Sequence, residues 1–128
     1  MATIEITDEN FVSHIESKGI LIMDFWAEWC GPCRSFGPIF EAASERHEDV
    51  VFGKVDTEAQ RQVAGVFKVR SIPMVVVFRD GIGIFQQAGA LPAAALDELL
   101  ENVAALDMDD VREKVAAQQA AESESGAE

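Results

Sequence analysis

The chain has 128 residues, a length typical of a single domain with one core. Hydrophobic residues make up 48% of the sequence and charged residues 26%, so a wholly disordered chain is excluded. Because the formal net charge of -13 repels phosphate backbones and anionic membrane surfaces, neither nucleic acid nor a membrane is expected as a partner.

The N-terminal segment carries acids where a signal peptide carries bases, and it has no continuous apolar region. We therefore interpret the protein as a mature cytoplasmic chain, with a monomer as the simplest expectation. The longest apolar run, residues 20–25, is interrupted by Asp24 and is far shorter than the roughly 18 residues of a membrane span. It predicts a buried strand.

The first elements are a short strand and a helix. Residues 4–6 alternate like a strand, and Thr7 is expected to cap the helix that follows. Residues 20–27 are apolar on both faces, as in a central parallel strand that helices cover on both sides.

The middle of the chain continues this alternation. A helix with a kink at Pro38 is expected to end near His47. The next predicted strand, residues 50–55, precedes a capping-box pattern at residues 57–60, which predicts the start of another helix.

The last strands are predicted to form an antiparallel hairpin. Residues 74–78 and 82–88 flank Asp80-Gly81, which is a strong turn signal. The final helix of the domain is expected between Pro92 and about Leu106.

Residues 107–128 are expected to form an acidic extension outside the domain of residues 1–106. An Asp107 cap and a narrow apolar stripe predict a short extra helix, and disorder is expected beyond Gln118. A solubilising appendage is favoured over a helix that docks on a partner.

Cys30 and Cys33 stand between a predicted strand and a predicted helix. A bridge between them closes almost no loop and adds little stability, so the pair calls for a chemical explanation. The unpaired N–H groups and the dipole at a helix N-terminus stabilise a thiolate, which predicts Cys30 as the nucleophile. Cys33, expected to be more buried, is predicted as the resolving thiol. Gly31 permits close backbone approach, and Pro32 stiffens the turn.

The alternative is half of a zinc site. Closed zinc sites use four ligands, and beyond the cysteine pair the chain offers only His14 and His47, which are widely separated. We therefore expect no bound metal.

Asp24 is an isolated acid in an apolar strand, six residues before Cys30. Desolvation would raise its pKa and let it exchange a proton with a neighbouring thiol near neutral pH. Asp24 is therefore predicted as the acid–base partner of Cys33. The alternative, that strand alternation turns Asp24 to water, is disfavoured by the large apolar residues around it.

Ile72-Pro73 precedes a predicted strand. Proline cannot donate to a strand ladder, so this edge could hold an extended substrate segment. Spacing alone favours a trans bond, because only about 5–6% of X-Pro bonds are cis. Trp29, next to Cys30, is expected on an apolar docking rim, and Trp26 is expected in the core.

These residues together resemble the thioredoxin family, and the resemblance covers about residues 3 to 106. The matching motifs are Asp24 to Cys33, Ile72-Pro73, Asp80-Gly81 and Gly89-Ala90. The resemblance implies an α/β thioredoxin fold with a central mixed sheet of about five strands flanked by four helices. It also implies that the Ile72–Pro73 bond is cis and packs beside the disulfide, with Asp24 buried behind it.

The resemblance further implies a cycle in which Cys30 attacks a client disulfide and Cys33 resolves the adduct. The substrate backbone is expected in a groove around six residues: Trp29, Gly31, Pro32, Ile72, Pro73 and Gly89. The chain is expected to hold no cofactor, because a flavin-containing thioredoxin reductase that uses NADPH recharges such a dithiol.

Two positions depart from the commonest family pattern. Met74 follows the proline where the family usually has Thr, which changes the polarity of the groove wall. Phe52 is assigned to the place of a buried Lys in many bacterial members, so we expect Asp24 to lack a charged partner. The segment 54–59 and the approach to Pro73 resemble the second bacterial thioredoxin type.

The predicted function is reduction of disulfide bonds in proteins. An oxidase or isomerase would need a more strongly stabilised reduced state, and the Gly31-Pro32 spacer argues against it. A binding module without redox turnover is the third interpretation, and its binding would survive replacement of both cysteines.

Overall fold

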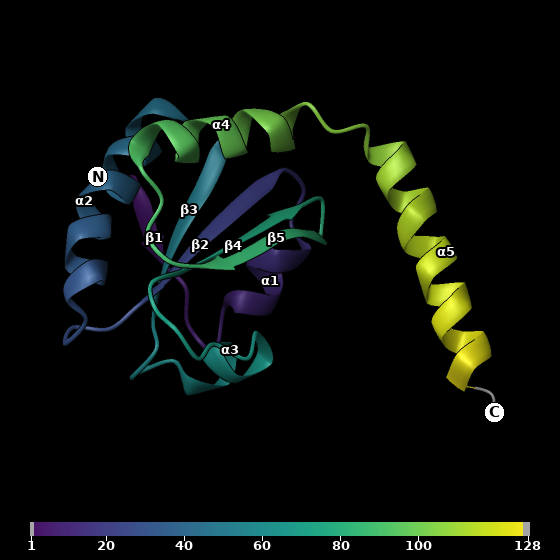
Figure 1. Cartoon of the computed structure of the whole chain (residues 1–128), viewed down its shortest axis with the longest axis horizontal. Coiled ribbons are helices and arrows are strands. Elements are labelled where there is room, and N and C mark those ends of the chain that lie inside the picture. Colours follow the sequence, from purple (N-terminus) through teal and green to yellow (C-terminus); the bar gives the residue numbers. More distant parts are fainter. Residues whose placement is uncertain (1, 127–128) are drawn as a thin grey trace.

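A five-stranded sheet forms the centre of the protein, whose residues 2–126 are described by a computed structural model. The elements follow in the order β1 (Thr3–Glu5), α1 (Phe11–Glu16), β2 (Ile20–Trp26), α2 (Gly31–Arg46), β3 (Val50–Asp56), α3 (Arg61–Val66), β4 (Met74–Arg79), β5 (Ile82–Ala88), α4 (Ala93–Ala104) and α5 (Met108–Gly126). The strand order in the sheet is β1-β3-β2-β4-β5 (Figure 1).

The sheet is mixed. β3 pairs in parallel with both β1 and β2, whereas β4 runs antiparallel to β2 and β5. The hairpin between β4 and β5 turns at Asp80 and Gly81, whose φ angles are 52° and 83°. Positive φ at both central residues fits the right-handed twist of the strands, so the predicted hairpin is confirmed.

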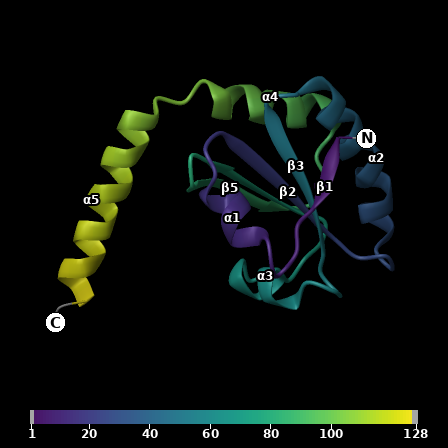
Figure 2. The ribbon, with the colours of Figure 1, turned by 180° about the vertical axis from the view of Figure 1, so that it is seen from behind.

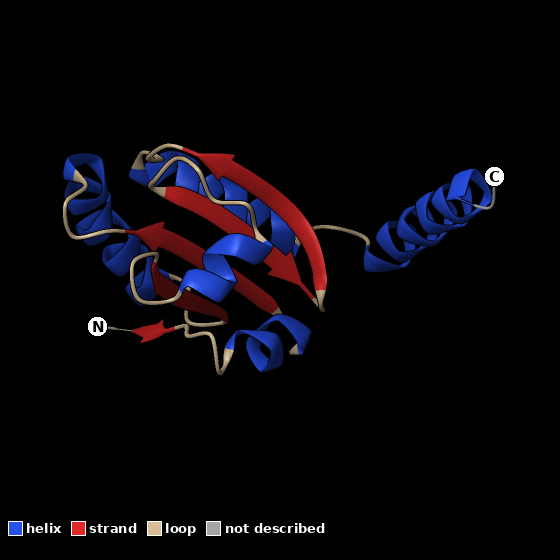
Figure 3. Ribbon diagram, turned by 90° about the horizontal axis from the view of Figure 1, so that it is seen from below, coloured by secondary structure: helices blue, strands red, loops and turns tan. Residues whose placement is uncertain are grey.

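Helices cover both faces of the sheet, as Figure 3 shows with the strands between them. Successive residues of β2 point to opposite faces. Ile22 belongs to the core cluster under α2 and α4, where Phe36 and Phe40 are fully buried. Met23 belongs to the cluster under α1 and α3. The predicted fold, a mixed sheet of five strands with four flanking helices, is confirmed.

Two helix starts differ from the predictions. α1 begins at Phe11, because Thr7 closes a preceding turn in which its hydroxyl accepts the N–H of Asn10 at 3.2 Å. The capping-box pattern at residues 57–60 does not start a helix, since α3 begins at Arg61. The N–H of Val63 instead donates to the carboxylate of Asp8 at 2.9 Å, so this helix end is satisfied from a distant part of the chain.

α5 extends the chain beyond the sheet domain, and Figure 2 shows it projecting away from the sheet. Asp107 accepts the N–H groups of Asp109 and Asp110, so the predicted cap is confirmed. α5 continues as helix to Gly126, past Gln118, where the apolar stripe of the sequence ends. None of the helices that the structure describes has the length and apolar character needed to span a membrane.

Arg79 connects the end of β4 to the chain between α4 and α5. Its guanidinium donates to the carbonyls of Val103, Ala104 and Leu106 at 2.8, 3.1 and 2.9 Å. The last carbonyls of a helix lack partners within the helix, so this side chain caps the C-terminal end of α4.

Candidate functional site

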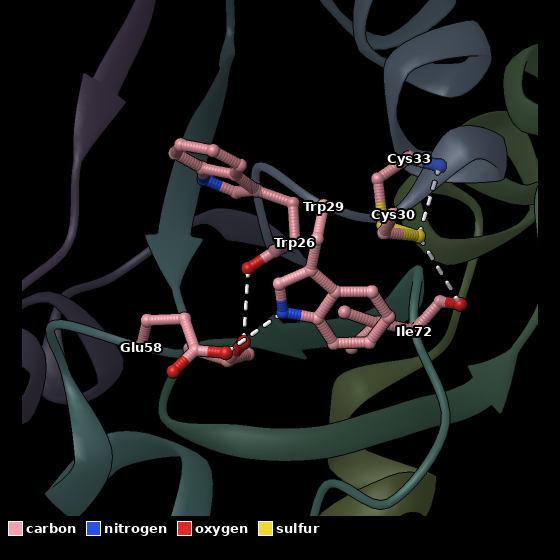
Figure 4. The surroundings of a disulfide bond; sticks show 7 residues. Trp26, Trp29, Cys30, Cys33, Glu58 and Ile72 are labelled. Carbon is pink, nitrogen blue, oxygen red and sulfur yellow. Dashed lines mark hydrogen bonds between the residues drawn. A yellow bond between two sulfur atoms is a disulfide. The ribbon is translucent and has the colours of Figure 1, made fainter.

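Cys30 and Cys33 form a disulfide where β2 passes into α2. Cys30 is the N-cap residue of the helix, and the backbone N–H of Cys33 donates to its Sγ at 3.2 Å (Figure 4). Pro32 occupies the first turn, where a missing N–H leaves no helical hydrogen bond unmade. The sequence therefore builds a helix N-terminus that points at a sulfur atom.

Burial does not distinguish the two cysteines. Each is 4% exposed, so the expectation that Cys33 is the more buried one is wrong. Gly31 and Pro32 between them are exposed. The two cysteines differ in their hydrogen bonding at the helix N-terminus: the sulfur of Cys30 accepts a backbone N–H, and Cys33 donates that N–H.

The loop before β4 brings a second segment to the disulfide. The Ile72–Pro73 bond is cis, as the family resemblance implies and against the expectation from spacing. The carbonyl oxygen of Ile72 lies 3.7 Å from Cys30 Sγ. The carbonyl of Pro73 accepts the N–H of Gly89 at 2.7 Å, and Gly89 has a φ of 107° that favours glycine. These contacts place three of the predicted groove residues at one edge.

Trp29 lies on the surface beside the cysteines and is 67% exposed. Its indole Nε1 donates to the Glu58 carboxylate at 2.7 Å (Figure 4). Glu58 was missed in the sequence, where it reads as part of a capping box. The parallel pairing of β2 with β3 brings the chain segments that follow the two strands to the same edge of the sheet, where the two side chains meet.

Trp26 is only partly buried, although the sequence predicts it in the core. Its carbonyl accepts both the N–H and the hydroxyl of Thr57, at 2.9 and 3.0 Å. Its indole Nε1 is buried and has no hydrogen-bond partner among the described residues.

Asp24 is 0% exposed, and neither of its carboxylate oxygens has a hydrogen-bond partner within residues 2–126. Burial raises its pKa from 3.8 to about 7, and the positive charge of Lys54 partly opposes this rise. The predicted burial of Asp24 is thus confirmed, and its carboxyl group can be either protonated or ionised near neutral pH.

Lys54 corrects the expectation about Phe52. Phe52 is buried in the apolar core cluster and pairs with Ile22 across the sheet, whereas Lys54 is the residue that pairs with Asp24. The position opposite Asp24 on β3 is therefore held by Lys54, two residues after Phe52. Asp24 thus does have a cationic neighbour, which lies one side-chain repeat of the strand beyond Phe52.

A cavity of about 250 Å³ lies beside the disulfide. Cys33 and Glu41 line it from α2, Lys54 lines it from β3, and Trp26 lines it from the end of β2. Cys33 and the charged side chains of Glu41 and Lys54 therefore share one cavity.

The histidines do not join the cysteines. His14 lies in α1, and His47 follows α2, where its Nε2 lies 2.7 Å from an Asp97 carboxylate oxygen. Within the described part of the chain, no group of three or more His, Cys, Asp or Glu side chains could hold a metal ion.

Comparison with known proteins identifies the family. The thioredoxin family model matches residues 2–102. A chain named as a thioredoxin 2 in Streptomyces coelicolor is 50% identical over 119 residues, covering 93% of this chain and 89% of that one. A thioredoxin of Mycobacterium tuberculosis is 38% identical over 104 residues, covering 80% and 90% of the two chains.

Family members use a cysteine pair in this position for dithiol–disulfide exchange and need no bound cofactor. The fold, the family match and the disulfide at the N-terminus of α2 agree with one another. The chain therefore belongs to the thioredoxin family and is a thiol–disulfide oxidoreductase.

Proposed function

We propose that the protein reduces disulfide bonds of client proteins, with Cys30 as the attacking nucleophile and Cys33 as the resolving thiol. The observation that carries this proposal is the Cys30 sulfur at the N-cap of α2, where it accepts the N–H of Cys33. In the dithiol form, a negative charge on this sulfur gains from that N–H group and from the helix dipole. Cys30 is then the cysteine that carries the thiolate.

The cycle moves two electrons from the dithiol to the client. The Cys30 thiolate attacks one sulfur of the client disulfide, a new S–S bond forms, and the other client sulfur leaves as a thiolate. The Cys33 thiolate then attacks Cys30 Sγ, so the Cys30–Cys33 disulfide forms and the second client thiolate leaves. The client is reduced, the protein is oxidised, and each departing thiolate takes up a proton.

Asp24 supports the second step in this proposal. Cys33 is a thiol until it loses a proton, and a carboxylate with a pKa of about 7 can accept that proton near neutral pH. Asp24 belongs to β2, the strand that leads into the cysteine loop. We assign it as the proton acceptor for Cys33.

The client backbone is assigned to the groove around Cys30. Trp29, Gly31 and Pro32 are exposed next to the cysteines in the chain. The cis Ile72–Pro73 segment, to which Gly89 is hydrogen-bonded, approaches Cys30 Sγ through the Ile72 carbonyl. An extended segment fits an edge where backbone groups can pair with it, since main-chain hydrogen bonds are independent of the client's side chains. This arrangement suits many different client proteins.

The oxidised protein needs two electrons to return to the dithiol. We propose that a flavin-containing thioredoxin reductase supplies them from NADPH, as in the family, and that the cycle runs in the cytoplasm. A reducing compartment keeps thiols reduced, which a dithiol reductant requires.

Two cysteine variants test the proposal. Cys33→Ser should accumulate a mixed disulfide between Cys30 and a disulfide-containing protein, visible as a heavier band on a non-reducing gel and released by excess thiol. Cys30→Ser should form no adduct and show no turnover. Ser35→Ala, an exposed change on the same helix, serves as the control and should behave as the wild type.

Appreciable turnover by Cys30→Ser would contradict the assignment of Cys30 as the nucleophile. Absence of any trapped adduct with Cys33→Ser would contradict the assignment of Cys33 as the resolving thiol. Client binding that survives the double replacement, with no turnover in the wild type, would favour a binding module.

A further inference from the structure

The ammonium group of Lys54 has two attractive neighbours, and all three residues line the cavity beside the disulfide. Its Nζ lies 3.8 Å from the Glu41 carboxylate and 5.5 Å from the centre of the Trp26 ring. Nζ also lies close to α2 at Gly37, one helical turn before Glu41, where a Cβ atom would be in ordinary van der Waals contact with it at 3.7 Å. Lys54 is thus attracted by a carboxylate and by an aromatic face.

Asp24 is the other carboxylate beside Lys54. The two residues are Cα partners across β2 and β3, and partners in register place their side chains on the same face of the sheet. Nevertheless, the Asp24 oxygens have no hydrogen-bond partner among the described residues, whereas Glu41 forms an ion pair with Lys54. Two carboxylates therefore compete for one cation, and the structure shows the outer one, from α2, paired with it.

We propose that Glu41 is a positioning residue of the redox site: by pairing with the Lys54 ammonium, it withholds part of that positive charge from Asp24. This inference rests on the proposed role of Asp24 as proton acceptor and names the residue that tunes it. Glu41 touches neither sulfur, and it acts on Asp24 through Lys54.

Four other charged groups lie around this site. Glu28 from the loop after β2 and Arg34 from α2 line the cavity, and both are exposed. On the other side of Lys54, Glu5 of β1 is its Cα partner and is exposed, and Asp56 at the end of β3 is partly buried; both line a second pocket with Lys54. Solvent screens exposed charges more strongly than half-buried ones. β4 contributes Val75 opposite Asp24, and α4 contributes the apolar Leu96 and Leu100 to this face. Lys54 is accordingly the cation best placed to affect Asp24.

The balance of these charges sets how strongly Asp24 holds a proton. Burial raises its pKa and Lys54 lowers it. Removing the Glu41 charge frees Lys54 to favour the ionised form of Asp24, which lowers the pKa further. Asp24 would then be a weaker base toward Cys33 near neutral pH.

The test is a titration of the Asp24 carboxyl carbon by NMR in the oxidised protein, where the cysteines do not titrate. Glu41→Gln should shift the Asp24 midpoint to lower pH. Glu98→Gln, which removes the same charge from an exposed position on α4, is the matched control and should shift it less. Thermal unfolding of each variant shows whether the fold is intact.

A second pair of variants tests the route through Lys54. In a Lys54→Met background, Glu41→Gln should shift the Asp24 midpoint much less than it does in the wild type. An equal shift in both backgrounds would mean direct repulsion between the two carboxylates and would overturn the proposal. No shift in the wild-type background beyond that of Glu98→Gln would overturn it as well.

The pH dependence of client reduction separates this inference from the proposed function. If the Asp24 midpoint moves and the pH profile of reduction moves with it, both stand. If the midpoint moves and the profile of reduction does not, Glu41 still positions Lys54, and the proton-accepting role of Asp24 is wrong.

Discussion

Asp24 and Lys54 are partners across the parallel β2–β3 pair, yet the Asp24 carboxylate has no hydrogen-bond partner among the described residues. A buried carboxylate without hydrogen bonds is costly in its ionised form. This cost makes the stability of the protein depend on pH, and the dependence can be measured.

Asp24→Ala should make the oxidised protein more stable at pH 8 than the wild type. The unfolded carboxyl ionises near 3.8 and the folded one near 7, so the folded state binds more protons between these values and the wild type loses stability as the pH rises through them. Three pH units correspond to at most roughly 4 kcal/mol. Urea unfolding of both proteins at pH 5 and pH 8 measures this. A stability difference between the two proteins that does not grow with pH would contradict the raised pKa.

The reduction potential of the Cys30–Cys33 pair should lie near -270 mV, the value characteristic of thioredoxin itself rather than one calculated from this structure. Equilibration in graded thiol–disulfide buffers, followed by alkylation and counting of free thiols, gives the potential. A value of about -180 to -120 mV would instead indicate an isomerase or oxidase.

Glu58→Ala should weaken client binding by releasing the Trp29 indole, which the Glu58 carboxylate holds at 2.7 Å. Loss of one hydrogen bond of about 1 kcal/mol corresponds to an increase in KM of up to about fivefold. kcat should change little, because neither residue is assigned to the sulfur chemistry. Glu58→Gln keeps an acceptor and serves as the control. If Glu58→Ala left both KM and the tryptophan fluorescence anisotropy unchanged, the carboxylate would not hold the indole.

Arg79→Met should destabilise the domain by roughly 1–3 kcal/mol, since a charged donor to three carbonyls at the end of α4 is lost. Arg112→Met is the comparison. Arg112 lies 3.8 Å from Asp80 with a side chain that is 53% exposed, so its loss should cost less than about 0.5 kcal/mol. Urea unfolding of the two variants gives both values, and equal losses would contradict the capping role of Arg79.

Local chemistry in the sequence was sufficient for several features. Cys30-Gly31-Pro32-Cys33 before an apolar helical stripe predicts the helix N-terminus at the sulfur, and Asp80-Gly81 predicts the hairpin. In each case the residues that predict the feature lie within a few positions of the feature itself. The physical cause is contained in the segment itself, so no tertiary information is needed.

The missed features depend on the register between strands distant in sequence. Lys54 faces Asp24 only because β2 and β3 pair in one particular register, and a displacement by two residues puts Phe52 in its place. The same strand pairing brings Glu58 to the Trp29 indole. The Asp8 carboxylate accepts the Val63 N–H at the start of α3, although the two residues are 55 positions apart in the sequence. Composition and spacing carry no information about such contacts until the sheet is assembled.

The family alignment also bears on the extension. A match confined to residues 1–106 could not cover 93% of a 128-residue chain, so the region shared with the Streptomyces coelicolor relative reaches into α5. The first part of the extension therefore has an aligned counterpart in that chain.

β4 runs from the disulfide to the junction of α4 with α5. The strand starts directly after Pro73 at the disulfide and ends at Arg79, which secures the junction of α4 with α5 (Figure 1). Six residues of strand span roughly 20 Å. A fluorescent label or surface tether attached through α5 would thus sit at the far pole from the sulfur atoms. A client engaged at Cys30 could be observed through such an attachment without being displaced by it.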